Sequence, residues 1–194
     1  MKALRVVTGV VAVLDRPDVD TDQIIPKQFL KRIERTGYGE FLFFDWAKDP
    51  DFELRRPEYQ GAKILVAGRN FGCGSSREHA AWALQQAGYD VVIAPSFGDI
   101  FRQNSLNIGL VPVRTDEARE LAAFGGQELT VDLEALEIRT PDGRTIPFAL
   151  GEHERHCILE GLDEIALTLH HEGEIGAYEA RTTAPIDTLA LQAG

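Results

Sequence analysis

The sequence from residue 63 to residue 113 reads KILVAGRNFGCGSSREHAAWALQQAGYDVVIAPSFGDIFRQNSLNIGLVPV, and this stretch decides the fold. It alternates short apolar runs, which are typical of buried strands, with segments of helical composition. Gly88 and Gly109 follow the helical segments, at the position where a left-handed residue commonly ends a helix. The expected strands are 63–67, 91–94 and 110–113, and the expected helices are 76–87 and 97–107. Consecutive βαβ units of this kind predict parallel strands with a ligand site at their carboxyl ends.

The sequence on either side of this stretch extends the predicted sheet. A valine-rich apolar run at 5–14 predicts a strand before it. The turn Pro141–Arg144 predicts a hairpin after it, so the sheet becomes mixed. The remaining predicted elements are a helix at 116–124, strands at 128–132, 137–140 and 145–148, and C-terminal helices at 152–160 and 162–169. We therefore expect an α/β fold in a single domain over residues 1–181, followed by a weakly ordered tail at 182–194.

The amino-acid composition limits the classes of protein to which the chain can belong. The chain has 194 residues, of which 44% are hydrophobic, and this is enough to close the core of one domain. Its net charge of -11, without a polybasic stretch, argues against a nucleic-acid partner. No apolar run approaches the roughly 20 residues of a membrane helix, and no secretory signal is found, so we expect a cytoplasmic protein. Cys73 and Cys157 are too few to ligate a metal cluster, and we expect no metal or cofactor in this chain.

The loop Gly72–Arg77 carries the chemistry of the predicted βαβ units. Its glycines let the backbone bend, and Ser75, Ser76 and Arg77 follow at the start of the expected helix. Free backbone N–H groups and the macrodipole make a helix N-terminus suitable for anions, and the planar guanidinium of arginine suits a carboxylate. An arginine in the first helical turn opposes the macrodipole unless an anion offsets it. The loop therefore predicts a carboxylate or phosphate site, and the simpler alternative is that Ser75 or Ser76 only caps the helix.

Acidic residues before this region offer a second candidate site. Asp18, Asp20 and Asp22 alternate as in a calcium loop, but the glycine and the bidentate glutamate that such a loop requires are missing. A turn stabilised by aspartate side chains is favoured, with polar contacts from Asp20, Thr21, Asp22 and Gln23 to a ligand or a partner. A solvated acidic turn without function is the alternative.

Histidine and cysteine side chains allow further alternatives. His153, His156 and Cys157 lie on one predicted helix and resemble a zinc motif, but the spacing of three between the histidines needs at least one further ligand, and none is near in sequence. His79 falls on the same helix face as Ser75, as a serine hydrolase would require, but no acidic partner or oxyanion hole can be assigned. Cys73 would be redox-sensitive if the helix terminus lowered its pKa, and a small buried side chain is the simpler interpretation.

Five motifs resemble those of a known family. They are DTDQIIP at 20–26, FFDW at 43–46, NFGCGSSREHA at 70–80, APSF at 94–97 and GLD at 161–163. Over most of its length the chain is similar to the small subunits of 3-isopropylmalate dehydratase, in the aconitase superfamily. The resemblance implies a swivelling β/β/α domain that closes over a separate large subunit, in which a four-iron four-sulfur cluster is bound. It also implies a lyase of leucine biosynthesis that isomerises 2-isopropylmalate and 3-isopropylmalate by dehydration and rehydration, active only as a heterodimer or higher assembly with that large subunit.

The resemblance also assigns roles to individual residues. Ser75 resembles the catalytic base of the family, and Ser76 and Arg77 resemble residues that hold a substrate carboxylate. Residues 29–35 resemble the loop that determines specificity. The other implied substrate contacts are Asp20, Thr21, Leu30, Arg32, Ile33 and Arg35, of which Leu30 and Ile33 would face the isopropyl group and Arg32 or Arg35 a carboxylate. The alternatives are a homoaconitase-like small subunit for a related hydroxy acid and a non-catalytic module that binds small carboxylates.

Overall fold

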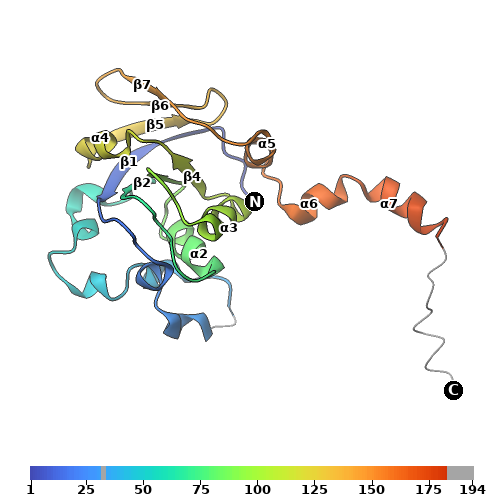
Figure 1. Ribbon diagram of the computed structural model, residues 1–194, viewed down its shortest axis with the longest axis horizontal. Coiled ribbons are helices and arrows are strands. Elements are labelled where there is room, and N and C mark those ends of the chain that lie inside the picture. Colours follow the sequence, from blue (N-terminus) through green and yellow to red (C-terminus); the bar gives the residue numbers. More distant parts are fainter. Residues whose placement is uncertain (32–33, 183–194) are drawn as a thin grey trace. The chain divides into compact units, whose positions relative to one another are not determined.

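The computed structural model describes residues 1–31 and 34–182, and its centre is a seven-stranded mixed sheet (Figure 1). The strand order is β4-β3-β2-β1-β5-β6-β7. The strands are β1 (Val6–Leu14), β2 (Ile64–Ala67), β3 (Val91–Ala94), β4 (Val111–Arg114), β5 (Glu128–Asp132), β6 (Glu137–Arg139) and β7 (Thr145–Pro147). The α-helices are α1 (Thr21–Ile24), α2 (Glu78–Gln86), α3 (Asp99–Ile108), α4 (Ala118–Leu121), α5 (Glu152–Glu160), α6 (Glu164–Leu169) and α7 (Glu172–Glu179). Short 3₁₀ helices are η1 (Lys27–Lys31), η2 (Gly39–Phe41), η3 (Trp46–Lys48), η4 (Glu53–Arg55), η5 (Pro57–Tyr59) and η6 (Ala122–Phe124).

The parallel half of the sheet confirms the predicted βαβ units. Strands β1 to β4 pair in parallel, and α2 and α3 connect β2 to β3 and β3 to β4. Every residue of β2 and β3 is buried, because helices or loops cover both faces of a parallel sheet. Gly109 caps α3 in the left-handed conformation with φ of 84°, as predicted. The loops that follow β2, β3 and β4 therefore meet at one edge of the sheet.

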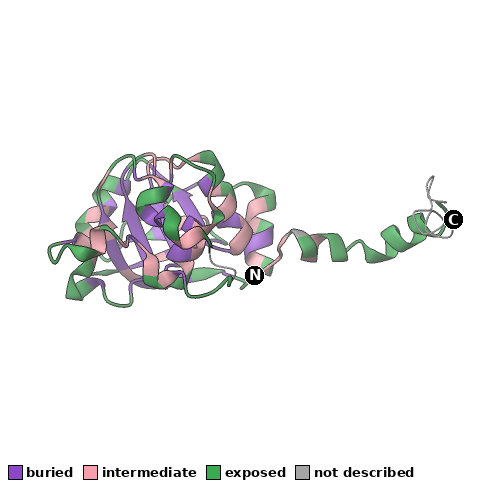
Figure 2. Ribbon diagram, turned by 90° about the horizontal axis from the view of Figure 1, so that it is seen from below, coloured by how far each residue is buried: buried purple, intermediate pink, exposed green. Residues whose placement is uncertain are grey.

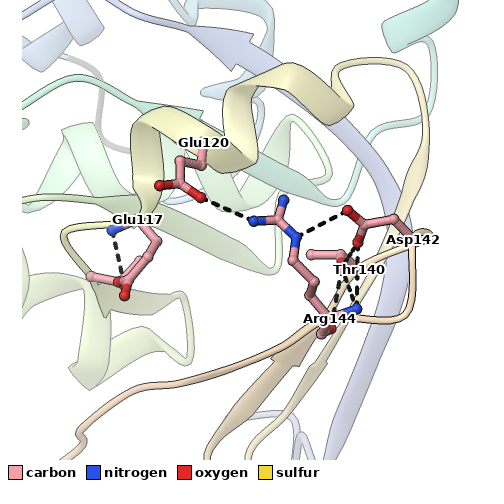
Figure 3. A network of polar contacts seen from close by, with 6 residues as sticks. Glu117, Glu120, Thr140, Asp142 and Arg144 are labelled. Carbon is pink, nitrogen blue, oxygen red and sulfur yellow. Dashed lines mark hydrogen bonds and ion pairs between the residues drawn. The ribbon is translucent and has the colours of Figure 1, made fainter.

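The antiparallel half of the sheet contains the predicted hairpin. β5 pairs antiparallel with β1, and β6 and β7 continue the sheet outward. At the turn between β6 and β7, the Arg144 side chain donates to Asp142 at 2.9 Å and to Glu120 of α4 at 3.0 Å (Figure 3). These charged contacts join the hairpin to α4.

The core forms two clusters, one on each face of the sheet, which appear as the purple interior of Figure 2. Alternate residues of β2 point to opposite faces, so that Leu65 belongs to one cluster and Val66 to the other. The first cluster includes buried residues of α2 and the large aromatic residues Phe43 and Phe71. The second cluster includes residues of the antiparallel strands and of helices α4 and α5, among them Ile158 of α5. Loops on the α2 side are thus anchored by aromatic packing rather than by regular structure.

Several helical elements differ from the sequence prediction. The helix expected at 76–87 begins only at Glu78, and the helix expected at 116–124 is shortened to α4 followed by η6. Residues 21–24, expected as a turn, form the helix α1 because Asp20 caps it. Helix α7 was not predicted, since Gly173 and Gly176 weaken its helical pattern.

The chain divides into two compact units, Met1–Leu162 and a second that begins at Asp163. The sequence predicted one domain to residue 181, and that boundary stays a prediction, as does the tail beyond it, of which residues 183–194 lie outside the described residues. None of the described helices is long and apolar enough to cross a membrane.

Candidate active site

The loop Gly72–Arg77 lies where the sequence predicts, at the carboxyl edge of the parallel strands. Phe71 N–H donates to the Ser96 carbonyl at 3.0 Å, which ties the loop after β2 to the loop after β3. Gly72 adopts φ of 73°, and a Cβ atom there would lie 2.2 Å from Cγ of Phe101. Gly74 also has a positive φ, of 88°. Both glycines are therefore required, Gly72 by close packing on α3 as well as by its backbone conformation.

Helix α1 supports the loop from the other side. Thr21 N–H donates to the Cys73 carbonyl at 3.0 Å, and its hydroxyl donates to the Ser75 carbonyl at 2.9 Å. The Asp20 carboxylate accepts from Gln23 N–H at 2.8 Å, and the Gln23 side chain accepts from Asp20 N–H at 2.9 Å, which forms a capping box. Thr21 is buried, with an exposed fraction of 1%. The predicted polar residues thus hold the loop in place.

Ser75 and Ser76 are both exposed. Arg77 is the N-cap residue of α2, with φ of -137° and ψ of 108°, and neither serine makes the side-chain bond of a cap. The alternative in which Ser75 or Ser76 caps the helix is therefore wrong. Within the described ranges, neither hydroxyl is hydrogen-bonded to another residue, so both are available to a ligand. Ser75 lines a pocket of about 240 Å³ together with Gly72, Cys73, Gly74, Gly98, Asp99 and Ile100.

The guanidinium of Arg77 forms a bidentate ion pair with Asp22 of α1. Both terminal nitrogens donate to the carboxylate, with Nη2 and Oδ2 separated by 2.9 Å. The Arg77 side chain is 15% exposed, whereas that of Asp22 is 49% exposed. The sequence predicts an anion beside this arginine, and within the chain Asp22 supplies it. Residue spacing does not reveal the pairing, because the two residues are 55 positions apart.

His79 belongs to an aromatic group instead of a catalytic pair. Its ring lies 4.7 Å from that of Trp82 and 5.1 Å from that of Tyr38, measured between centroids. Burial lowers the pKa of His79, so the neutral form is favoured. In the part of the chain that the structure describes, His79 is not hydrogen-bonded to Ser75. The geometry gives no support to a serine hydrolase.

The thiol of Cys73 is not activated. Burial, followed by the charges of Asp20 and Asp18, raises its pKa. The pKa of Cys157 is also raised by burial, and its Sγ lies 3.7 Å from Nε2 of His153. Both shifts favour the protonated thiol, which is the less reactive form.

The three alternating aspartates do not converge on a metal ion. Asp18 accepts from Asn70 at 2.9 Å and from Arg69 at 3.2 Å, whereas Asp20 caps α1 and Asp22 pairs with Arg77. Among residues 1–31 and 34–182, no group of three or more His, Cys, Asp and Glu side chains could hold a metal ion. Each carboxylate has a structural partner of its own instead.

The segment expected to determine specificity is anchored by aromatic stacking. Phe29 of η1 lies 4.0 Å from Phe41 and 4.8 Å from Phe44, between ring centroids. Leu30 is half-buried against the first core cluster. Arg32 and Ile33, two of the predicted substrate contacts, lie outside the described residues.

Arg35 lies beside α2. Its guanidinium lies 5.9 Å above the ring of Trp82, and its carbonyl accepts from Gln86 at 2.8 Å. Trp82 is one turn along α2 from the loop that carries Ser75. The end of the segment at 29–35 therefore contacts the helix that begins at the candidate site.

Comparison with known families covers nearly the whole chain. Residues 1–118 match the family model described as the aconitase C-terminal domain. Residues 118–152 match one described as LeuD_N. Residues 164–184 match the model for the C-terminal domain of the 3-isopropylmalate dehydratase small subunit.

Individual relatives agree with the family models. A 3-isopropylmalate dehydratase small subunit of Bacillus licheniformis is 52% identical over 95% of this chain and 98% of its own length. One of Koribacter versatilis is 54% identical over 92% of this chain and 98% of its own length. A crystal structure of 3-isopropylmalate dehydratase from Methanocaldococcus jannaschii is similar with a TM-score of 0.67 and 30% identity, covering 90% of this chain and 99% of that one. The chain therefore belongs to the 3-isopropylmalate dehydratase small subunits, within the aconitase C-terminal domain family.

Proposed function

We propose that this chain is the small subunit of a hydro-lyase of leucine biosynthesis, which isomerises 2-isopropylmalate and 3-isopropylmalate together with a larger subunit. The observation that carries the proposal is the loop Gly72–Arg77, where two exposed hydroxyls and an oriented guanidinium lie together at the carboxyl edge of the parallel strands. A diacid substrate needs hydrogen-bond donors and a fixed positive charge of this kind. The names of the relatives support the choice of substrate and imply the larger subunit.

Ser75 acts as the base in this proposal. Its deprotonated oxygen takes the proton from the carbon beside the hydroxyl-bearing carbon and becomes a hydroxyl, while the substrate hydroxyl departs and an alkene forms. The proton returns to carbon when water adds to the alkene in the other orientation. A free serine is far too weak a base, so the alkoxide must be stabilised by the start of α2, by Arg77 and by the partner. Because Ser75 is exposed, closure against the larger subunit is needed to exclude water from the reaction.

Ser76 and Arg77 bind a substrate carboxylate, and Asp22 positions the arginine. A guanidinium has five N–H donors, of which the bidentate pair occupies two. In this proposal the remaining donors bind the diacid, while the paired edge keeps the plane of the group in one orientation. In this proposal Asp20 and Thr21 act by holding the loop, through the capping box and the bond to the Ser75 carbonyl.

In this proposal the segment at 29–35 determines which substrate side chain is accepted. Leu30 would face the isopropyl group, as would Ile33, and Arg32 or Arg35 would meet the second carboxylate. The position of Arg35 over α2 supports its share in this role, since α2 begins at the loop. The roles of Arg32 and Ile33 stay predictions.

A four-iron four-sulfur cluster belongs to the larger subunit in this proposal. The described residues of this chain offer no set of side chains that could ligate it. When bound in the partner, the cluster would supply the Lewis acid for departure of the substrate hydroxyl. The residues assigned here act on the carboxylates, the alkyl group and the transferred proton.

Reconstitution tests the proposal. The chain is combined with a cluster-loaded large subunit, and consumption of 2-isopropylmalate is followed. We expect Ser75→Ala to lower kcat by at least about a hundredfold, which is the usual contribution of a general base, without loss of association. Thr145→Ala, which removes an exposed hydroxyl from the far strand β7, should leave the rate unchanged.

Several outcomes would contradict this assignment. Activity of the chain without any large subunit would overturn the two-subunit proposal. Full turnover by Ser75→Ala would remove Ser75 from the mechanism. Consumption of a different hydroxy acid, with 2-isopropylmalate untouched, would retain the reaction class but overturn the substrate.

A further inference from the structure

Helices α6 and α7 make up the described part of the second unit. Among residues 163–182, no residue whose side chain is described is buried, and both helices are green in Figure 2 except for partly buried positions near the start of α6. The helices have six and eight residues, and two glycines interrupt α7. Isolated helices shorter than about 12–15 residues are marginal in water, so this unit needs a packing surface that it does not provide itself.

Large apolar side chains are concentrated on these two helices. Of the six exposed large hydrophobic residues in the described chain, four lie here, and we call them the C-terminal apolar set. The set consists of Ile165, Leu169, Ile175 and Tyr178, with exposed fractions of 73%, 59%, 39% and 61%. Ile165 and Leu169 are four residues apart, and Ile175 and Tyr178 three, so each pair shares one face of its helix. Exposed apolar residues with this spacing are typical of a helix that binds in a groove.

Charge indicates which kind of surface covers the set. The chain has 31 acidic and 20 basic residues; six acidic residues and one arginine fall at 163–194, which leaves 25 acidic and 19 basic residues for 1–162. Both units are therefore net negative. Docking on the first unit, or on a second copy of this chain, would bring like charges together. A partner with an apolar groove and a rim of lysine and arginine is complementary in both respects.

We infer that the C-terminal apolar set docks in an apolar, basic-rimmed groove of the large subunit. This inference rests on the proposed function, which requires that subunit. It gives the second unit a task separate from catalysis, because the candidate active site lies wholly within the first unit. The second unit would keep the two subunits associated while the first unit opens and closes over substrate, and this raises the effective concentration of the first unit near its partner.

Binding of full-length variants to the purified large subunit tests the inference. We expect the double variant Ile165→Glu with Leu169→Glu to raise Kd at least about tenfold, because it removes two apolar anchors and adds charge. The neutral pair Ile165→Gln with Leu169→Gln should act in the same direction. The matched control is Val6→Glu, at a 48% exposed apolar residue of β1, and it should bind as the original chain does. Unchanged Kd in both double variants would overturn the inference.

Two measurements on the isolated chain test the competing surfaces. A thermal midpoint that falls in the double variants but not in Val6→Glu, with Kd unchanged, would assign the set to the first unit of the same chain. Dimers of the original chain that become monomers in the double variants, with Kd unchanged, would assign it to a second copy. Either result would overturn the inference.

Salt dependence and activity complete the test. Raising the salt concentration from about 50 to about 500 mM should weaken association, since rim charges are screened over a shorter distance, and no change would overturn the basic rim. A pair that associates through the set but leaves 2-isopropylmalate unconverted would contradict the proposed function alone. A pair that converts 2-isopropylmalate with Kd insensitive to both double variants would contradict the docking alone.

Discussion

Asp22 and Arg77 form the contact on which the candidate site depends at the scale of single residues. The guanidinium is mostly buried and the carboxylate is half in solvent, so the pair lies at the surface of the loop with the acid outermost. A charged and largely buried arginine without a partner would be costly. The same carboxylate that satisfies Arg77 also fixes the plane in which its remaining donors point.

Replacement of Asp22 tests whether this contact positions the arginine. We expect Asp22→Asn to lower kcat/KM about tenfold in the reconstituted enzyme, because the amide cannot pair with both guanidinium nitrogens as a charged acceptor. The measurement is steady-state kinetics with 2-isopropylmalate at several ionic strengths. Asp45→Asn, at an exposed aspartate paired with Lys48, is the control and should not change kcat/KM. A higher kcat/KM for Asp22→Asn would mean that Asp22 competes with substrate instead of positioning Arg77.

Gly72 offers a second test at this scale, through the stability of the loop. Gly72→Ala should destabilise the fold by more than about 3 kcal/mol, since its Cβ would lie 2.2 Å from the ring of Phe101 in addition to the left-handed φ. Gly61 has nearly the same φ, 74°, with open space around it. Gly61→Ala should therefore cost only about 1 kcal/mol, the contribution of the backbone conformation alone. Urea unfolding curves measure the free energy of unfolding of both variants. Equal losses of stability would show that packing against Phe101 does not matter.

Among the secondary-structure elements, α1 shows how a very short helix becomes stable. Four residues are far too few for a helix in isolation. The capping box of Asp20 and Gln23 satisfies backbone donors at its start, and Thr21 docks it against the loop through two hydrogen bonds. The helix exists because it is held at both its cap and its buried side.

Helices α3 and α5 are joined by the bidentate pair of Arg102 and Glu154, with distances of 2.7 and 2.6 Å. The hydrogen bond from Arg102 lowers the pKa of Glu154 below its usual 4.5. A carboxyl whose pKa is lower in the folded chain stabilises the fold above the unfolded pKa, and this contribution is lost as the pH falls below 4.5 through the folded value.

The pH dependence of unfolding tests this link between elements. Glu154→Gln should be less stable than the original chain at about pH 7 and should show a shallower loss of stability below about pH 4.5, so that the two converge in acid. Glutamine still accepts from Gly151 N–H, as Glu154 does at 3.1 Å, so the helix cap is retained. Urea midpoints between about pH 3 and pH 7 measure the effect, with Glu128→Gln on β5 as the control. If the urea midpoint falls with pH in parallel for Glu154→Gln and the original chain, the ion pair of Arg102 and Glu154 does not contribute to stability in the expected way.

In the whole molecule, only the parallel half of the mixed sheet carries the candidate site. The parallel half brings the ends of β2 and β3 together, and the loop Gly72–Arg77 lies at that edge. The antiparallel half extends the sheet away from the site, and its hairpin is tied to α4 by Arg144. The second unit, from Asp163, carries neither part of the site and offers its apolar set for association.

Much of the fold and the site loop could be predicted from the sequence, because these features depend on neighbours in the chain. Apolar runs, glycines after helices and the hairpin turn all act within about a dozen residues, and strands β1 to β7 lie where those patterns indicate. The glycine bend that carries Ser75 is equally local. The start of α2 was predicted two residues too early, since propensity does not reveal that Arg77 is extended.

The tertiary structure decided the contacts that hold the loop of the candidate site. Asp22 reaches Arg77 across 55 residues and Thr21 reaches the Ser75 carbonyl across 54, and no periodicity encodes such pairs. The sequence does not distinguish Asp18, Asp20 and Asp22, whereas in the folded chain each carboxylate binds a different residue. Local sequence specifies backbone conformation through short-range sterics and hydrogen bonds, whereas the partner of a charged side chain depends on which segments the closed core brings together.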